Sequence, residues 1–129
     1  MMQHLERWHQ LLRDRDPAGL GDLLADDVVF HSPVVHRPQA GKAITTVYLT
    51  AALHVLLANG FHYVREVVDG QDAVLEFMAE IDGIVINGVD LIHFDADGRI
   101  DDFKVMVRPA KAMAMLQQQM AAMLEKIKR

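Results

Sequence analysis

Three turn signals divide the second half of the chain into four short apolar segments, and this division limits the fold more than any other feature. The turn signals are Asp69-Gly70, Asp82-Gly83 and the run Asp95–Gly98. Asp-Gly pairs tolerate the positive φ angles that tight hairpins require. The segments between them are rich in β-branched and aromatic residues and cover residues 61–68, 73–81, 84–94 and 99–108. This pattern predicts four successive strands that form an antiparallel meander.

The first part of the chain has helical periodicity instead. Leu5, Trp8 and Leu11 recur at helical spacing and predict a first helix. Asp16 and Pro17 predict the N-cap and the first turn of a second, short helix. The inner positions predicted for this second helix are Leu20, Leu23 and Leu24.

A third helix is predicted after a short strand at residues 28–32 and a loop at residues 33–41. Asn59-Gly60 is the signal for its C-terminal end. The inner positions predicted for this helix are Ile44, Val47, Tyr48, Ala51 and Val55. A final helix is predicted after Pro109, with one apolar side that carries Met113, Leu116, Met120, Met123, Leu124 and Ile127. Helices followed by a meander predict an α+β domain, with helices gathered on one face of a curved sheet.

Composition narrows the class of protein. With 129 residues, 51% of them hydrophobic, we expect one domain that covers residues 1–129. There is no cysteine, which excludes disulfides, thiolate metal sites and a cysteine nucleophile. Glu6 and Arg7 lie where a signal peptide requires an apolar core, so we expect a cytoplasmic location. The net charge of −5 disfavours a nucleic-acid partner. The longest apolar stretch, at residues 47–58, is too short to span a membrane.

Asp90 is the residue with the strongest functional signal. It lies within the otherwise apolar segment Ile84–Phe94, on the same alternating face as Ile92. A buried, unpaired carboxylate is costly, so this group must be hydrogen-bonded, neutral or in contact with a cavity. We expect a cavity between the concave sheet face and the helices, with Asp90 in its wall. The alternative is a structural carboxylate that is hydrogen-bonded to Trp8, Tyr48 or water.

The chain gives no sequence signal for a metal or a bound cofactor. It has seven histidines, but no two are spaced to place both imidazoles on one helical face. Alternation with Ser32 and Asp90 places His31 and His93 on the faces away from the cavity. Residues 95–102 resemble a calcium loop only superficially, because the glycine comes too early and no glutamate closes the loop. We therefore expect no metal and no cofactor.

The order of the predicted elements and two sequence runs resemble the nuclear transport factor 2-like superfamily. The runs are L-L-A-D-D-V-V-F-H-S-P at 23–33 and D-L-I-H-F-D-A-D-G-R-I at 90–100. More narrowly, the chain resembles a SnoaL-like domain, a group that includes polyketide cyclases and is related to ketosteroid isomerase. The resemblance implies a cone-like, mostly antiparallel sheet with three N-terminal helices on its concave side and a C-terminal helix. The superfold hosts both enzymes and binding proteins.

The resemblance also implies roles for individual residues. In ketosteroid isomerase, an acid at the position of Asp90 and a tyrosine on the first helix donate hydrogen bonds to an oxyanion. This chain keeps the acid but has Trp8 at the tyrosine position, and it keeps a second pocket tyrosine as Tyr48. The family's general base precedes a proline, where this chain has Ser32 before Pro33. A serine hydroxyl requires its own activating base, so steroid isomerisation is not expected.

These observations lead to one leading function and two alternatives. We expect a small, mostly hydrophobic molecule in the cavity, with isomerisation, dehydration, cyclisation or epoxide opening as the candidate reactions and Asp90 as the candidate acid or base. The residues predicted to contact the ligand are Trp8, Leu24, Val28, Phe30, Ser32, Tyr48, Asp90, Ile92, Phe103 and Val105. A non-catalytic binding module and a protein-interaction domain are the alternatives. We expect a homodimer formed through the outer sheet face, where Lys104, Met106 and Arg108 lie.

Overall fold

The sheet has six strands in the order β2-β1-β6-β5-β4-β3. The computed structural model describes residues 2–15, 17–34 and 36–128. The strands are β1 (Leu24–His31), β2 (Gln39–Ala40), β3 (His62–Asp69), β4 (Asp72–Ile81), β5 (Ile84–Phe94) and β6 (Ile100–Arg108). Among the described strands, only β1 and β6 pair in parallel, and the other neighbours are antiparallel. The meander from β3 to β6 is therefore confirmed, with boundaries close to the predicted ones.

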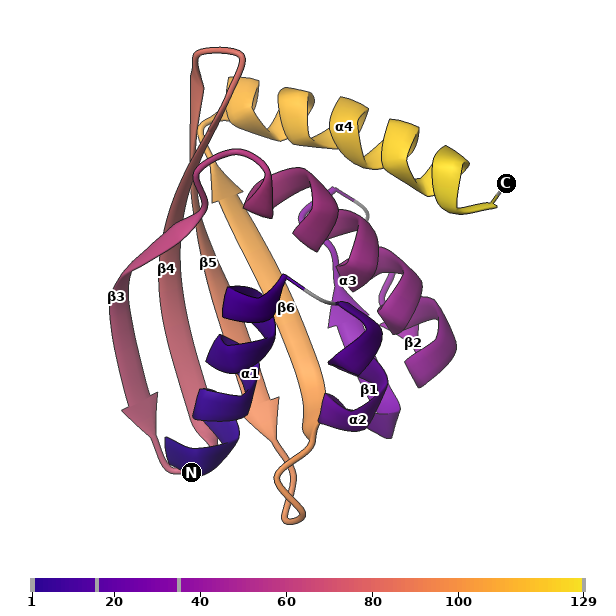
Figure 1. Cartoon of the computed structure of the whole chain (residues 1–129), viewed down its shortest axis with the longest axis vertical. Helices are drawn as coiled ribbons and strands as arrows, with labels where there is room; N and C mark the ends of the chain where they lie inside the picture. The colour runs from indigo at the N-terminus through magenta and orange to yellow at the C-terminus, as the bar shows by residue number, and fades with distance from the viewer. Residues whose placement is uncertain (1, 16, 35, 129) are drawn as a thin grey trace.

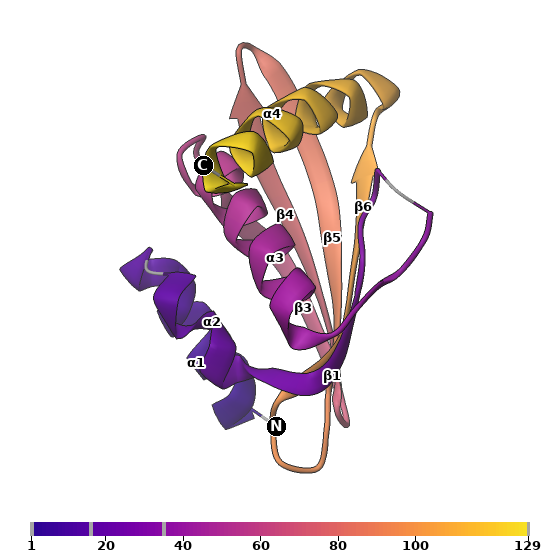
Figure 2. The same ribbon diagram turned by 90° about the vertical axis from the view of Figure 1, so that its right-hand side faces the viewer.

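The helices lie on the concave side of this curved sheet (Figure 1). They are α1 (Met2–Asp14), the short α2 (Leu20–Leu23), α3 (Lys42–Leu57) and α4 (Ala110–Lys128), with a 3₁₀ turn at Pro17–Gly19. Figure 2 shows α3 running along the concave face and α4 crossing above it at one end of the sheet. The α+β architecture is thus confirmed. The curvature matters for the site because it leaves room between the sheet, α3 and α4.

The hairpin turns have the backbone conformation that their residues predict. Gly70 and Gly83 have φ values of 60° and 80°, and Asp82 has a φ of 51°. These values lie in the left-handed region that glycine and aspartate tolerate better than other residues. The turn at Asp95 is closed by its own side chain, because its Oδ1 accepts hydrogen bonds from the backbone N–H groups of Asp97 and Arg99 at 2.9 and 3.0 Å.

The first strand differs from its prediction. β1 begins at Leu24, four residues before the predicted start at Val28. Leu24 therefore belongs to a strand and not to the preceding helix, because it pairs in parallel with Ile100 of β6. Because Ile100 lies far from Leu24 in the sequence, no local sequence pattern indicates that the strand begins at Leu24. The predicted N-cap at Asp16 lies outside the described residues.

The inner face predicted for α3 is partly wrong. Ile44 and Val47 are 37% and 36% exposed, whereas Thr45 and Leu49 are buried. Ala51 and Val55 are buried as predicted. The physical reason is that α3 is apolar on nearly all sides, so periodicity alone does not define which side faces the sheet.

The hydrophobic core consists of two clusters that meet in the middle of the sheet. One cluster, under α1 and α2, contains Trp8, Phe30 and Phe103. The other, under α4, contains Phe77 and Leu116. Three partly buried side chains pack against both clusters, namely Phe61, Tyr63 and Val105. These three side chains therefore lie at the boundary between the two clusters.

Gly88 allows the second cluster to pack closely against β5. It lies directly opposite Phe77 of β4. A Cβ added at Gly88 would overlap the ring of Phe77 and approach the carbonyl oxygen of Met106 to 2.9 Å. Phe77 is fully buried, so its ring has little room to move.

We predict that Gly88→Ala lowers the free energy of unfolding by about 2 kcal/mol, the usual size of an overpacking penalty. Urea unfolding followed by circular dichroism measures this change. Gly21→Ala in α2 is the matched control, because an added Cβ there meets no atom within 4 Å. A Gly88→Ala protein as stable as the wild type would show that Phe77 does not pack over this position.

Candidate functional site

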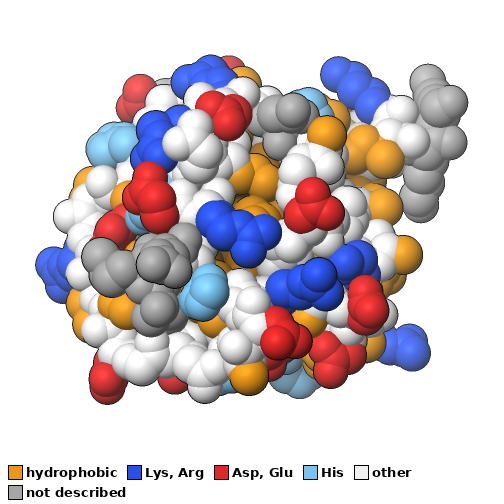
Figure 3. Space-filling model, turned by 60° about the horizontal axis from the view of Figure 1, so that its bottom comes forward, with side chains coloured by type: hydrophobic (Ala, Val, Ile, Leu, Met, Phe, Trp, Pro, Cys, Tyr) orange, Lys and Arg blue, Asp and Glu red, His pale blue; other side chains and the backbone are white. Residues whose placement is uncertain are grey.

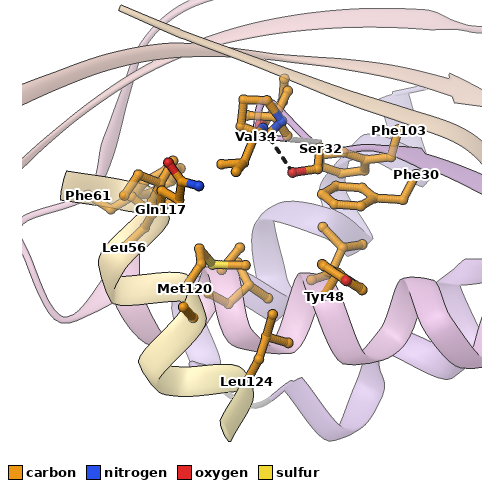
Figure 4. Close-up of a pocket in the computed structure, with 18 of the residues that line it drawn as sticks. Phe30, Ser32, Val34, Tyr48, Leu56, Phe61, Phe103, Gln117, Met120 and Leu124 are labelled. Atoms are coloured by element: carbon orange, nitrogen blue, oxygen red, sulfur yellow. Dashed lines mark hydrogen bonds between the residues drawn. The ribbon is translucent and has the colours of Figure 1, made fainter. Parts of the chain in front are cut away.

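A pocket of about 230 Å³ opens where the two core clusters meet. Its walls come from α1, the end of β1, α3, β3, β5, β6 and α4, and most of them are apolar. Figure 4 shows aromatic side chains of the sheet, including Phe30 and Phe103, facing Met120 and Leu124 of α4. The predicted cavity on the concave side is therefore present in the structure.

Asp90 lies in the buried wall of this pocket and is 5% exposed. Its carboxylate Oδ2 accepts a hydrogen bond from the hydroxyl of Tyr63 at 2.6 Å. The Tyr63 oxygen in turn accepts a hydrogen bond from the indole N–H of Trp8 at 3.0 Å. Residues from β5, β3 and α1 thus form a chain in which Trp8 fixes the hydroxyl of Tyr63, and Tyr63 donates to Asp90.

The second carboxyl oxygen of Asp90, Oδ1, has no side-chain hydrogen-bond partner among the described residues. Among the described residues, Tyr63 is the recorded side-chain hydrogen-bond partner of this carboxyl, and it contacts Oδ2. No fully buried side-chain oxygen or nitrogen in the described part of the chain lacks a partner. Oδ1 is therefore not completely sealed, and Asp90 lines the pocket. This oxygen is available to a bound molecule.

Burial shifts the acid–base properties of the pair. Burial raises the pKa of Asp90 from 3.8 to about 7, and the hydrogen bond from Tyr63 lowers it by less. The pKa of Tyr63 is raised well above 10.0, first by burial and then by the negative charge of Asp90. Near neutral pH, Asp90 therefore exists in both protonation states while Tyr63 stays a neutral donor.

Seven of the predicted contact residues line the pocket. They are Trp8, Phe30, Ser32, Tyr48, Asp90, Phe103 and Val105. Leu24, Val28 and Ile92 do not line it, and each is at most 2% exposed within the first core cluster. Strand alternation with Phe30 and Asp90 put Val28 and Ile92 on the pocket face of the sheet, whereas Leu24 was assigned to the preceding helix. All three belong to the cluster that α1 and α2 cover, so helix packing fills the space there.

The polar residues predicted to assist Asp90 lie elsewhere in the pocket. The Ser32 hydroxyl oxygen accepts a hydrogen bond from the backbone N–H of Val34 at 3.1 Å. Tyr48 packs its ring against Phe30, with 6.2 Å between the ring centroids. Neither Ser32 nor Tyr48 has a recorded hydrogen bond to Asp90 within the described ranges. Trp8 acts on Asp90 only through Tyr63.

The sequence interpretation missed Tyr63 and the contribution of α4. Tyr63 lies at the start of a predicted strand and alternates with Phe61, and both side chains line the pocket. That alternation was the available signal, but it did not identify Asp90 as the partner. The α4 residues in the lining are Leu116, Gln117, Met120, Ala121 and Leu124. The predicted apolar side of this helix included Leu116, Met120 and Leu124, but the prediction did not say what this side covers, and it did not include Gln117 or Ala121.

The histidines do not contribute to this pocket. His31 lies 3.1 Å from Asp102, and His93 lies 2.6 Å from Asp101, measured between side-chain nitrogen and oxygen atoms. Among the described residues, no group of three His, Asp or Glu side chains is arranged to hold a metal ion. In the same part of the chain, no helix is both long and apolar enough to cross a membrane. Acidic and basic side chains are interspersed on the face in Figure 3.

Comparison with known proteins identifies the family. The model of the SnoaL-like domain matches residues 5–103, so the chain belongs to the SnoaL-like domain family. A structure described as a steroid delta-isomerase from Pseudomonas aeruginosa is 40% identical, with a TM-score of 0.92, and the match covers 98% of this chain and 92% of that one. No curated protein matches the chain.

Two further structures match over most of the chain. An uncharacterised bacterial protein with a cystatin-like fold from Silicibacter pomeroyi is 30% identical, with coverage of 95% and 85% and a TM-score of 0.86. An NTF2-like protein of unknown function from Mesorhizobium loti is 23% identical, with coverage of 84% and 90% and a TM-score of 0.73. The nuclear transport factor 2-like fold is therefore confirmed.

Because the pKa of Asp90 is raised in the folded state, we predict that ionisation of Asp90 lowers the free energy of unfolding as the pH rises. Between pH 4 and pH 7 the folded state holds a proton on Asp90 that the unfolded state has lost, so the free energy of unfolding falls as the pH rises. The expected loss attributable to Asp90 is about 3 kcal/mol from pH 5 to pH 8.

Asp90→Asn keeps an oxygen that can accept the hydrogen bond from Tyr63 but cannot ionise. Subtracting the urea-unfolding free energy of this variant from that of the wild type at each pH isolates the contribution of Asp90. We predict that this difference, wild type minus variant, becomes smaller or more negative as the pH rises, because only the wild type loses stability through Asp90. A difference that is constant between pH 5 and pH 8 would contradict the raised pKa.

Proposed function

We propose that the protein binds a small, mostly apolar molecule in this pocket and that Asp90 transfers a proton to or from it without a cofactor. The observation that carries this proposal is the position of Asp90, whose carboxyl has one oxygen fixed by Tyr63 and the other open to an apolar cavity. A carboxyl with a pKa of about 7 is suited to exchange protons near neutral pH.

The size of the cavity supports a small ligand. Its volume is about 230 Å³, and an engineered apolar cavity of about 150 Å³ binds benzene. The pocket therefore suits a molecule of one or two rings. A molecule with four fused rings, such as a steroid, would have to extend beyond the mouth. We therefore propose a ligand smaller than the steroids named for the relative from Pseudomonas aeruginosa.

Isomerisation is the reaction that fits one acid–base group best. In the conversion of a β,γ-unsaturated ketone to its conjugated isomer, a carboxylate removes a proton from the α carbon and returns it to the γ carbon. One group performs both steps, so no second base is required. The similarity to a structure described as a steroid delta-isomerase supports this reaction class.

The residue at the family's base position favours a second function. Ser32 precedes Pro33 where the isomerase pattern has an aspartate, and its hydroxyl accepts a hydrogen bond from Val34 without a neighbouring base in the described structure. If Asp90 only donates a hydrogen bond from its neutral form, the protein is a carbonyl-binding module without turnover. The pH dependence separates the two functions, because a base requires the carboxylate and a donor requires the acid.

Trp8 provides the readout for binding. It is the single tryptophan in the sequence and lines the buried part of the pocket. Titration with a two-ring ketone should change its fluorescence. If neutral Asp90 donates to the carbonyl, the dissociation constant should rise about tenfold per pH unit above pH 7. In Asp90→Asn the amide N–H also donates but does not ionise, so binding should persist and lose its pH dependence.

Turnover is measured with a two-ring β,γ-unsaturated ketone by the appearance of the conjugated enone absorbance. For an isomerase, kcat/KM should rise with pH and level off above pH 7, and Asp90→Asn should have no activity. Tyr63→Phe should shift the pH midpoint upwards, because the hydrogen bond from Tyr63 lowers the pKa of Asp90. A fully active Asp90→Asn enzyme would exclude Asp90 as the acid or base.

We also propose that two copies of the chain associate through the outer face of the sheet. Met106 and Val67 on this face are 53% and 54% exposed. Arg65 and Glu76 form an ion pair at 3.5 Å beside them. An isologous interface repeats the same patch on both subunits, and this patch contains apolar side chains and charges of both signs. In this proposal the main dimer contact is the sheet and not α4.

Met106→Glu should therefore convert a dimer to a monomer, because it introduces a charge among apolar side chains. Sedimentation equilibrium gives the mass of each species. Ile127→Glu on α4 is the matched control, since Ile127 is also an exposed apolar residue at 39%. Dissociation by Ile127→Glu alone would place the interface on α4, and a monomeric wild type would reject the dimer.

A further inference from the structure

The side of α4 that faces the pocket is apolar except at one position. Leu116, Met120 and Leu124 line the pocket at intervals of four residues. Gln117 lies beside them and also lines the pocket. Its amide has no recorded hydrogen bond to the described part of the chain. A polar side chain without an intramolecular partner in an apolar lining is available to a ligand.

Gln117 and Ser32 point into the same open space from opposite walls (Figure 4). Ser32 lies at the end of β1, whereas Gln117 comes from α4. The Ser32 oxygen accepts the N–H of Val34, which leaves the hydroxyl proton of Ser32 free to donate. Together the two side chains offer a hydroxyl donor, an amide donor and an amide acceptor.

These two residues lie at the more exposed part of the pocket, whereas Asp90 lies in its buried part. Gln117 is exposed and Ser32 is partly exposed, whereas Asp90 and Trp8 are 5% and 1% exposed. The lining also contains the buried aromatic rings of Phe30 and Phe103. The pocket therefore has a polar group at its buried part, mostly apolar walls that also include the phenol of Tyr48, and a second polar pair at its mouth.

We propose that Gln117 and Ser32 form a second polar subsite, which selects ligands that carry a hydrogen-bonding group at the end opposite the group that meets Asp90. This inference rests on the proposed function, in which the pocket binds a small molecule. The ligand class that follows is a one- or two-ring carbonyl compound with a second polar group on its far ring.

The charged residues of the pocket lining indicate whether the second polar group of the ligand is charged or neutral. No lysine or arginine is among the described residues that line the pocket. A carboxylate or phosphate on the ligand would have no cation to pair with and would be repelled by ionised Asp90. The second group is therefore neutral, such as a hydroxyl, a carbonyl or a lactone.

The test compares two probes, α-tetralone and its derivative with a hydroxyl on the ring that does not carry the ketone. Calorimetric titration at pH 6 measures both dissociation constants while Asp90 is mainly neutral. The wild type should bind the hydroxylated probe about tenfold more tightly, which corresponds to one or two neutral hydrogen bonds. Gln117→Leu should abolish most of this preference by weakening the hydroxylated probe and leaving α-tetralone unchanged or tighter.

Gln118→Leu is the matched control. Gln118 is the next residue of α4, is exposed and does not line the pocket, so its replacement should leave both dissociation constants unchanged. Ser32→Ala should reduce the preference in part, and Ser32→Thr, which restores a hydroxyl, should recover it. Thermal unfolding of each variant verifies that the fold is retained.

The possible outcomes separate the two proposals. Equal binding of both probes by the wild type, or a preference that survives in Gln117→Leu, overturns the polar subsite and leaves the proposed small-molecule binding intact. If the wild type binds neither probe, the proposed function fails for this ligand class and the subsite fails with it. If the preference for the hydroxylated probe is lost in Gln117→Leu and kept in Gln118→Leu, both the small-molecule binding and the polar subsite are supported.

Discussion

The hydrogen bond from Tyr63 to Asp90 is the interaction on which the pocket depends. A carboxyl in an apolar sheet is costly unless its oxygens have partners. Tyr63 provides a partner for one oxygen, and Trp8 holds the Tyr63 hydroxyl in place. These three residues come from β5, β3 and α1, so the site exists only when the helix and both strands are assembled. The other oxygen has no side-chain partner among the described residues.

The pocket follows from the way the core is divided. One cluster packs under α1 and α2 and the other packs under α4, and the sheet curves between them. Side chains at the boundary, such as Phe61 and Val105, contact both clusters but do not close the space. A cavity at such a boundary can be shaped by residues of α4 with little effect on the first cluster. The pocket lining includes members of both clusters, such as Phe103 of the first and Leu116 of the second.

Membership of the SnoaL-like family explains the architecture but leaves the chemistry to individual residues. The family match ends at residue 103, whereas α4 begins at Ala110 and supplies part of the pocket. Asp90 is the one carboxyl in the described lining of the pocket. The proposed reaction uses that single carboxyl for every proton transfer. This requirement distinguishes the chain from enzymes that divide the work between an acid and a base.

Local signals determined the parts of this protein that the sequence predicted. The Asp-Gly turns define the meander because each hairpin depends on its own few residues, and Asp90 was recognisable because it interrupts an apolar alternation. Long-range packing decided the rest. The inner face of α3, the parallel pairing of Leu24 with Ile100, and the contact of Tyr63 with Asp90 join residues far apart in the chain. The position of Gln117 opposite Ser32 is of the same kind, since only the packing of α4 across α3 brings the two walls of the pocket together.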